Sequence, residues 1–234
     1  MSPSLNLAVF HLINGFAGRP MLDRFVMFAM DATVFHNALI AAPYVILWFH
    51  DRRPQVRVRL ALGLMAGVLA ILIARTLAHV MPFEVRPAFA AASGFKPLSA
   101  PLPATLETWS AFPSDNAAFT LAVALGLYPV NRRLSIGLSA AVMVIYGVFR
   151  VYAGVHYPAD ILAGWMIGAA AILAVQPLAA RTQWVSWIRI PPAVEPVLYG
   201  LAFLALCEYA SMFETIRKIT RAVPLTAHLL HQAL

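Results

Sequence analysis

Cysteine and charge are the two scarcest features of this chain, and each scarcity excludes a class of protein. One cysteine, Cys207, occurs in 234 residues, which excludes an internal disulfide framework and a CxxC-type metal site. Charged residues make up 12% of the chain and hydrophobic residues 61%, whereas a soluble domain carries about a quarter charged residues. A soluble domain of this size could not bury so much apolar surface, so the composition indicates an integral membrane protein.

The apolar runs predict an all-α fold, a polytopic membrane bundle that residues 1–234 form as a single domain. Several runs are long enough to cross the roughly 30 Å of hydrocarbon in a bilayer. The first apolar run, about Leu5–Phe16, is too short to span and is predicted as an interfacial or re-entrant helix. The proline-rich connection 81–112 is predicted to lie at the surface with one short interfacial helix. Six spans are predicted, at about 21–49, 60–80, 114–128, 134–151, 158–175 and 194–212.

The net charge of +7 comes from basic residues in short loops and does not form the stripe typical of nucleic-acid binding. The loops 51–59, 131–134 and 181–189 hold eight arginines and alternate with the loops at the other ends of the spans. The positive-inside rule therefore predicts that these three loops face the cytoplasm. A basic stretch near the C-terminus (Arg217, Lys218 and Arg221) then falls on the outer side, against the rule.

Three short polar runs stand at the predicted span ends that face away from those loops: 85–87, 112–116 and 150–160. Two of them contain an arginine, Arg86 or Arg150, whose planar guanidinium can donate two parallel hydrogen bonds to a phosphoryl group. Ser114 follows a proline and precedes an apolar helical run, which is an N-cap position. The free backbone N–H groups of such a helix start, together with the serine hydroxyl, form an anion site.

His156 and Asp160 are four residues apart, a spacing that places two side chains on one face of a helix. A carboxylate in that position can hold one imidazole nitrogen in its protonated form and leave the other free for nucleophilic attack. Taken with the two arginines, this pair indicates phosphoryl-transfer chemistry at a membrane surface.

These runs resemble the type-2 phosphatidic-acid phosphatase family, whose pattern reads Lys-x6-Arg-Pro, Pro-Ser-x-His and Ser-Arg-x5-His-x3-Asp. Arg150, His156 and Asp160 match the third motif at every spacing. The sequence around them is similar to that of the bacitracin-resistance type undecaprenyl-diphosphatases. The resemblance implies that His156 is a nucleophile forming a phosphohistidine and that Asp160 activates it. It implies that Arg86, Ser114 and Arg150 bind phosphoryl oxygens. It also implies that no metal or other cofactor takes part, in keeping with only ten carboxylates in the chain.

The sequence departs from the family pattern at three positions. His79 stands in place of the first-motif lysine and is predicted among the phosphate-binding groups, together with Arg75, which lies one turn earlier and is predicted to supply the missing charge. Phe149 replaces the serine before the third-motif arginine. Asn116 occupies the general-acid position, where the family has a histidine that protonates the leaving group. An asparagine amide donates hydrogen bonds but does not give up a proton.

The third departure bears on the substrate. Expelling a lipid alkoxide requires a proton, because an alcohol is about as weak an acid as water, with a pKa near 16. Expelling a lipid monophosphate from a diphosphate requires less help, because its last pKa is about 6. Asp115 is an alternative proton donor if its surroundings keep it protonated. The pattern therefore favours a diphosphate substrate, or else a disabled variant of an active enzyme.

Three functions agree with the sequence. The first is a lipid phosphatase in the inner (cytoplasmic) membrane of a bacterium, with its active site facing the periplasm or outside, that removes the terminal phosphate of a polyprenyl diphosphate. The second is a phosphotransferase that passes the phosphoryl group from His156 to another acceptor. The third is a catalytically silent lipid-binding protein that retained the fold. Each has a lipid diphosphate or phosphate as its partner, and none involves nucleic acid.

Overall fold

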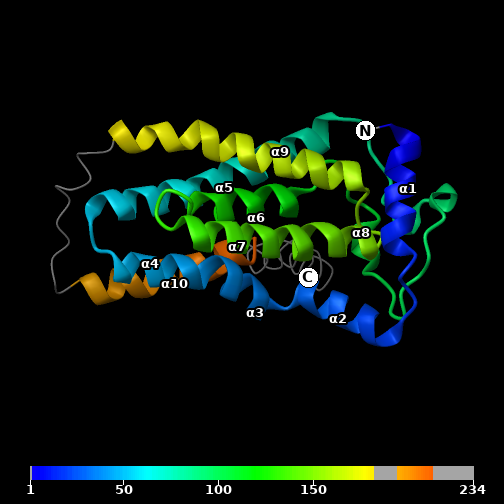
Figure 1. Ribbon diagram of the computed structural model, residues 1–234, viewed down its shortest axis with the longest axis horizontal. Helices are drawn as coiled ribbons and strands as arrows, with labels where there is room; N and C mark the ends of the chain where they lie inside the picture. The colour runs from blue at the N-terminus through cyan, green and yellow to red at the C-terminus, as the bar shows by residue number, and fades with distance from the viewer. Residues whose placement is uncertain (1, 182–193, 213–234) are drawn as a thin grey trace, which may run out of the picture.

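The computed structural model describes residues 2–181 and 194–212, and these form an elongated bundle of helices (Figure 1). The all-α prediction is confirmed. Short π-helical turns at Asn37–Ala41 and Val144–Val148 connect pieces of longer helices. The α-helices are α1 (Pro3–Asn14), α2 (Pro20–Asp31), α3 (Thr33–His36), α4 (Ala42–His50), α5 (Pro54–Val80), α6 (Asp115–Gly126), α7 (Arg132–Met143), α8 (Phe149–Tyr152), α9 (Pro158–Val175) and α10 (Glu195–Ala210).

Helices α5, α6 and α9 pack directly on one another at the centre of the bundle. Small residues permit this close approach, as is common between membrane helices. A Cβ added at Gly63 of α5 would lie 3.0 Å from the Cα of Gly126 in α6. A Cβ added at Gly164 of α9 would lie 2.5 Å from the carbonyl oxygen of Ser114. The tight contact between α6 and α9 brings the N-terminus of α6 against the first turns of α9.

Three helical stretches are long and apolar enough to cross a membrane: Pro54–Val80, Arg132–Tyr152 and Pro158–Ala180. A fourth span results if Pro20–Asp31 and Val34–His50 are counted together, although they are bent by 60°. The predicted first span, 21–49, is therefore broken near its middle. The helical membrane bundle is as predicted, but by length and composition the described residues contain three or four spans rather than six.

The other two predicted spans form shorter helices. The segment 114–128 contains α6, which has 12 residues and is almost entirely buried between its neighbours. At 1.5 Å per residue such a helix is about 18 Å long, which is less than the hydrocarbon thickness. The segment 194–212 contains α10, with 16 residues. The sequence analysis predicted six spans because it relied on apolar composition. A helix buried inside a bundle is as apolar as one that faces lipid, so composition does not distinguish the two.

Two predicted boundaries also differ. Helix α5 begins at Pro54, so the predicted loop 51–59 shrinks to three residues and its last part is helical. Proline is favoured in the first turn of a helix, where its missing N–H needs no partner. The connection 81–112 contains three single-turn 3₁₀ helices at Pro87–Phe89, Ala91–Ser93 and Ala104–Leu106 instead of one interfacial helix. The first predicted helix is present as α1 and packs against α8 and α9.

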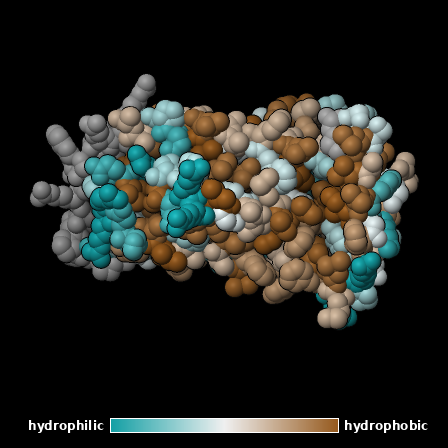
Figure 2. Space-filling model, viewed as in Figure 1, coloured by the Kyte–Doolittle hydropathy of each residue, from teal (hydrophilic) through white to brown (hydrophobic). Residues whose placement is uncertain are grey.

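The polar loops separate toward the two ends of the bundle. The chain reversals at 51–53 and 127–131 lie at one end, and the 81–112 connection and the turn between α8 and α9 lie at the other (Figure 1). Hydrophobic residues cover much of the middle of the visible face, with hydrophilic residues gathered nearer its ends (Figure 2). The predicted basic loop 181–189 and the stretch 217–221 lie outside the described residues, apart from Arg181. The predicted orientation across the membrane stays a prediction.

Candidate active site

His156 lies in the turn between α8 and α9 and is 2% exposed. Its Nδ1 atom is 2.7 Å from the backbone carbonyl oxygen of Ala111. A carbonyl oxygen only accepts, so Nδ1 carries the proton and donates it to Ala111. The Nε2 atom is then the unprotonated nitrogen. It lies 3.3 Å from a guanidinium nitrogen of Arg86 and 3.3 Å from the hydroxyl oxygen of Ser114.

Asp160 is fully buried in the first turn of α9, and its carboxylate is the second neighbour of Nδ1. One carboxylate oxygen accepts the backbone N–H of Tyr157 at 2.7 Å, which caps the helix. The same oxygen lies 3.6 Å from Nδ1 of His156. The sequence predicted that this carboxylate holds one imidazole nitrogen in its protonated form, with both residues on one helix face. In the structure His156 precedes the helix, and the Ala111 carbonyl lies closer to Nδ1 than Asp160 does.

Ser114 is the N-cap of α6, as predicted, and its hydroxyl accepts the backbone N–H of Ala117 at 3.4 Å. Its own backbone N–H donates to the carbonyl oxygen of Asp160 at 3.1 Å. This main-chain hydrogen bond joins the second and third sequence motifs. It places the serine hydroxyl beside Nε2 of His156.

Arg86 joins the 81–112 connection to the turn that contains His156 through hydrogen bonds to both segments. Its guanidinium is buried and extends toward Nε2 of His156, which accepts from it. The other donor contacts are to backbone carbonyl oxygens at 2.9–3.3 Å, those of Leu106, Trp109, Ser110 and Val155. Arginine has five N–H donors, so these contacts leave little of the guanidinium free. The sequence predicted a phosphate-binding arginine, and the structure adds a structural role that the motif does not reveal.

Arg150, the second predicted arginine, is in α8. Its carbonyl oxygen accepts the backbone N–H groups of Val155 and His156 at 3.0 and 3.4 Å, which closes the turn before the nucleophile. Its Nε atom is buried and has no hydrogen-bond partner within the described part of the chain. The side chain is not among the residues that line the cavity in front of His156.

The electrostatic setting of His156 favours a neutral imidazole. Burial lowers the pKa of His156 well below its usual 6.5, and the positive charges of Arg86 and Arg150 lower it further. Burial also lowers the pKa of Arg86, to about 10, which leaves its guanidinium charged at neutral pH. An unprotonated nitrogen next to two cationic groups can attack an electrophile that carries negative charge, such as a phosphoryl group.

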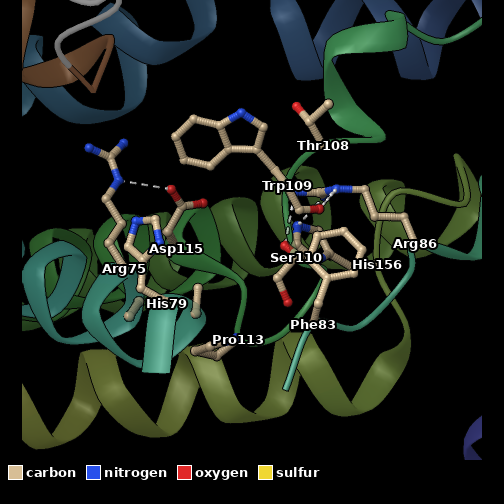
Figure 3. A pocket seen from close by; sticks show the side chains of 12 residues that line it. Arg75, His79, Phe83, Arg86, Thr108, Trp109, Ser110, Pro113, Asp115 and His156 are labelled. Carbon is tan, nitrogen blue, oxygen red and sulfur yellow. Dashed lines mark hydrogen bonds and ion pairs between the residues drawn. The ribbon is translucent and has the colours of Figure 1, made fainter. Parts of the chain in front are cut away.

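A cavity of about 310 Å³ opens in front of Nε2 (Figure 3). Arg86, Ser110 and His156 lie toward one side of it, with Trp109 above them. Pro113 of the second motif also lines the cavity, as do Phe83 and Thr108, which no sequence motif contains. Their positions depend on how the 81–112 connection folds back over the helix ends, for which a single sequence carries no signal.

Three further residues considered from the sequence lie on the far side of the same cavity. Arg75 and His79 project from the last two turns of α5, and Asp115 projects from the first turn of α6 (Figure 3). Arg75 forms an ion pair with Asp115, with Nε 3.3 Å from Oδ2. Asn116 is not among the residues that line the cavity, and its side-chain amide donates to Asp115 at 3.0 Å. The residue at the general-acid position therefore supports Asp115 rather than facing the cavity.

Metal ligands are not clustered in the described residues, where no group of three or more histidine, cysteine, aspartate or glutamate side chains could hold an ion. The geometry offers a neutral imidazole nitrogen, two buried guanidinium groups, a hydroxyl and a helix N-terminus. Such an arrangement at the end of a membrane bundle fits a tetrahedral oxyanion attached to a lipid.

The fold is that of a helical membrane bundle, and the site at its end holds a histidine and basic side chains suited to a phosphoryl group. The sequence model of the PAP2 superfamily matches residues 83–184, which contain Arg86, Ser114, Arg150, His156 and Asp160. The chain is similar to this superfamily over that region, and the resemblance predicted from the motifs is confirmed.

Two similar proteins agree with this assignment. The chain is 27% identical over 177 residues to the putative undecaprenyl-diphosphatase YbjG of Escherichia coli K12, covering 75% of this chain and 83% of the relative. It is also similar to the crystal structure of Aquifex aeolicus LpxE, with a TM-score of 0.54 and 27% identity. That alignment covers 74% of this chain and 95% of the LpxE chain. The matching family model and the name of the first relative, a putative diphosphatase, support a phosphatase interpretation of the site.

Proposed function

We propose that this protein removes the terminal phosphate of a polyprenyl diphosphate, with His156 as the nucleophile. The observation that carries the proposal is the tautomer of His156. Ala111 accepts the proton on Nδ1, which leaves the lone pair of Nε2 directed at the site where Arg86 and Ser114 meet. These two donors and Arg150 would contact the phosphoryl oxygens when the substrate is in place.

The reaction has two steps. Nε2 of His156 attacks the terminal phosphorus, an N–P bond forms, and the bridging P–O bond breaks to release the lipid monophosphate. Water then attacks phosphorus, the N–P bond breaks, and inorganic phosphate leaves. Negative charge on the phosphoryl oxygens in each transition state is stabilised by donors that are already in position. Asp160, 3.6 Å from Nδ1, would stabilise the positive charge that the imidazole gains when it is phosphorylated.

Asn116 supports a diphosphate substrate. Its amide neither lines the cavity nor carries a transferable proton, so it does not act as the acid that an alkoxide leaving group requires. A lipid monophosphate leaves more readily because its last pKa is about 6. The similarity to a putative undecaprenyl-diphosphatase supports a long polyprenyl chain on the substrate. An inner-membrane location with the cavity on the outer side also belongs to this proposal.

The test is phosphate release from undecaprenyl diphosphate in detergent, by the unchanged protein and by the His156→Ala and Asn116→His variants. The proposal expects turnover by the unchanged protein and none by His156→Ala. It expects Asn116→His to change diphosphate turnover by less than the roughly 10²-fold typical of a general acid. If phosphate passes to an added lipid or sugar without free phosphate appearing, the protein is a phosphotransferase. If His156→Ala is as active as the unchanged protein, the nucleophile has been assigned to the wrong residue.

A further inference from the structure

Helix α1 contains none of the sequence motifs, and the superfamily match begins only at residue 83. The helix lies across the end of the bundle and packs against α8 and α9 (Figure 1). The turn that contains His156 joins Tyr152, the last residue of α8, to Ala159 in the first turn of α9. Two asparagines of α1, Asn14 and Asn6, form hydrogen bonds to the backbone of these two residues.

Asn14, the last residue of α1, is 1% exposed. Its amide nitrogen donates to two backbone carbonyl oxygens, that of Tyr152 at 2.8 Å and that of Lys96 at 3.1 Å. Its Oδ1 atom accepts the backbone N–H of Lys96 at 2.7 Å. The side chain of Tyr152 is held separately, since its hydroxyl donates to Asp23 of α2. Asn14 therefore fixes the main chain at the end of α8 relative to the 81–112 connection.

Asn6 holds the other side of the turn. Its Oδ1 atom accepts the backbone N–H of Ala159 at 3.0 Å. The first N–H groups of a helix have no partner within the helix, so α1 supplies an acceptor that α9 itself lacks. Between the two asparagines, Phe10 is fully buried and its ring packs edge-on against Tyr157, with ring centroids 5.6 Å apart. The chain is thus bonded to α1 both before and after His156.

We propose that α1 positions His156 for attack, with Asn14 and Asn6 as positioning residues. This inference rests on the proposed function, because it acts through the same nucleophile. Nε2 of His156 lies 3.3 Å from both Arg86 and Ser114, and that spacing depends on where the turn lies. Misplacing a reacting atom by about 1 Å can lower a rate by roughly 10²-fold, even when the substituted residue is far from the chemistry. Neither asparagine lines the cavity, so their effect on turnover comes through the turn.

Two other contacts attach α1 to the 81–112 connection without involving the turn. Nε2 of His11 lies 2.7 Å from the carbonyl oxygen of Ser93, which only accepts, so the imidazole donates. The ammonium group of Lys96 donates to the carbonyl oxygen of Gly15 at 3.1 Å. Removing the His11 contact loosens α1 from the connection and leaves both hydrogen bonds to the turn in place. It therefore separates attachment of the helix from positioning of His156.

The test measures kcat and KM with undecaprenyl diphosphate in detergent, at a temperature where circular dichroism shows each variant to be folded. Asn14→Leu has a similar shape and removes all three hydrogen bonds of the amide. We expect its kcat to fall by roughly 10–10²-fold. Its KM should change little, because misplacement of the nucleophile affects the transition state rather than substrate binding. His11→Phe, the matched control, keeps a ring but removes the donor, and should lower the Tm without lowering kcat.

Asn6 provides a second comparison that does not depend on the folding of Asn14→Leu. Asn6→Leu removes the acceptor for the N–H of Ala159 and should lower kcat. Asn6→Asp keeps an acceptor there, and its negative charge is favourable at the N-terminus of α9, so its kcat should equal that of the unchanged protein. Hydrogen exchange of peptides covering residues 150–160, followed by mass spectrometry, gives a readout besides activity. Exchange should be faster in the two leucine variants than in the unchanged protein or His11→Phe.

The possible outcomes distinguish the inference from the proposed function. Unchanged kcat and unchanged exchange in Asn14→Leu and Asn6→Leu would overturn the role of α1 and leave the proposed function standing. Equal falls in kcat for Asn14→Leu and His11→Phe would overturn it too, since α1 would then act only by holding the bundle together. If the unchanged protein releases no phosphate, the proposed function is overturned, and exchange of residues 150–160 decides whether α1 holds the turn.

Discussion

Arg86→Lys tests how far the active site depends on one side chain for its shape. The substitution keeps the positive charge but removes the guanidinium fork, which donates to four backbone carbonyl oxygens from the 81–112 connection and the turn before α9. A lysine ammonium donates from a single nitrogen and does not reach carbonyl groups that lie on separate sides of a guanidinium. We therefore expect at least two of these hydrogen bonds to be lost.

Hydrogen bonds to charged groups contribute roughly 1.5–3 kcal/mol each, so losing two costs about 3 kcal/mol at the low end. For a chain of 150–250 residues, each kcal/mol lowers the Tm by about 2–4 °C, which gives a fall of about 6–12 °C. Thermal unfolding in detergent, followed by circular dichroism, measures this shift. Limited proteolysis should show faster cleavage between residues 81 and 112.

Arg75→Lys is the matched control, because it makes the same chemical change in the same cavity. The Arg75 side chain is 28% exposed and makes its ion pair through one nitrogen, 3.3 Å from Asp115. We expect its Tm to fall by no more than about 2–4 °C, corresponding to about 1 kcal/mol. Equal shifts for the two variants would refute the structural role of Arg86.

Three further predictions follow from the buried groups and the helix contacts. Asp160→Asn should lower kcat only moderately, because the Ala111 carbonyl still accepts the proton on Nδ1 and keeps the same imidazole tautomer. The fall, measured by steady-state kinetics, should be smaller than the roughly 10⁴-fold loss found where such a substitution forces the wrong tautomer. Folding lowers the pKa of His156, so its contribution to stability is present above about pH 6.5 and is lost as pH falls toward the folded-state pKa. The Tm should therefore fall as the solution becomes acidic, and His156→Asn should make that fall smaller. Gly63→Ala should cost about 1–3 kcal/mol in unfolding free energy through overpacking, whereas Gly137→Ala, with nothing within 4 Å, should be neutral or stabilising; equal effects would contradict the packing argument.

The sequence predicted the membrane bundle and the residues that gather at its end, because long apolar runs and motif spacing are local properties of the chain. It did not predict that α6 is short, since a helix buried by protein and a helix facing lipid have similar compositions. The contact between His156 and Ala111 could not be predicted either, because every residue type has a backbone carbonyl and the residue type does not show which one the histidine contacts.

The direction in which Asp115 and Asn116 point shows a second limit. Successive residues of a helix point about 100° apart, so neighbouring positions face different surroundings. Motif spacing identified Asn116 as the general-acid position, but the packing of α6 against α5 turns Asp115 toward the cavity. That rotation is set by tertiary contacts such as the approach of Gly63 to Gly126.

The central claim is that Nε2 of His156 becomes phosphorylated, and trapping that intermediate tests it most directly. The protein is mixed with undecaprenyl diphosphate labelled in its terminal phosphate and quenched in base, in which a phosphohistidine survives. The account predicts a base-stable, acid-labile label on the peptide that contains His156, absent from His156→Ala. Turnover of the same substrate with the label on another residue, or with labelling that persists in His156→Ala, would contradict it.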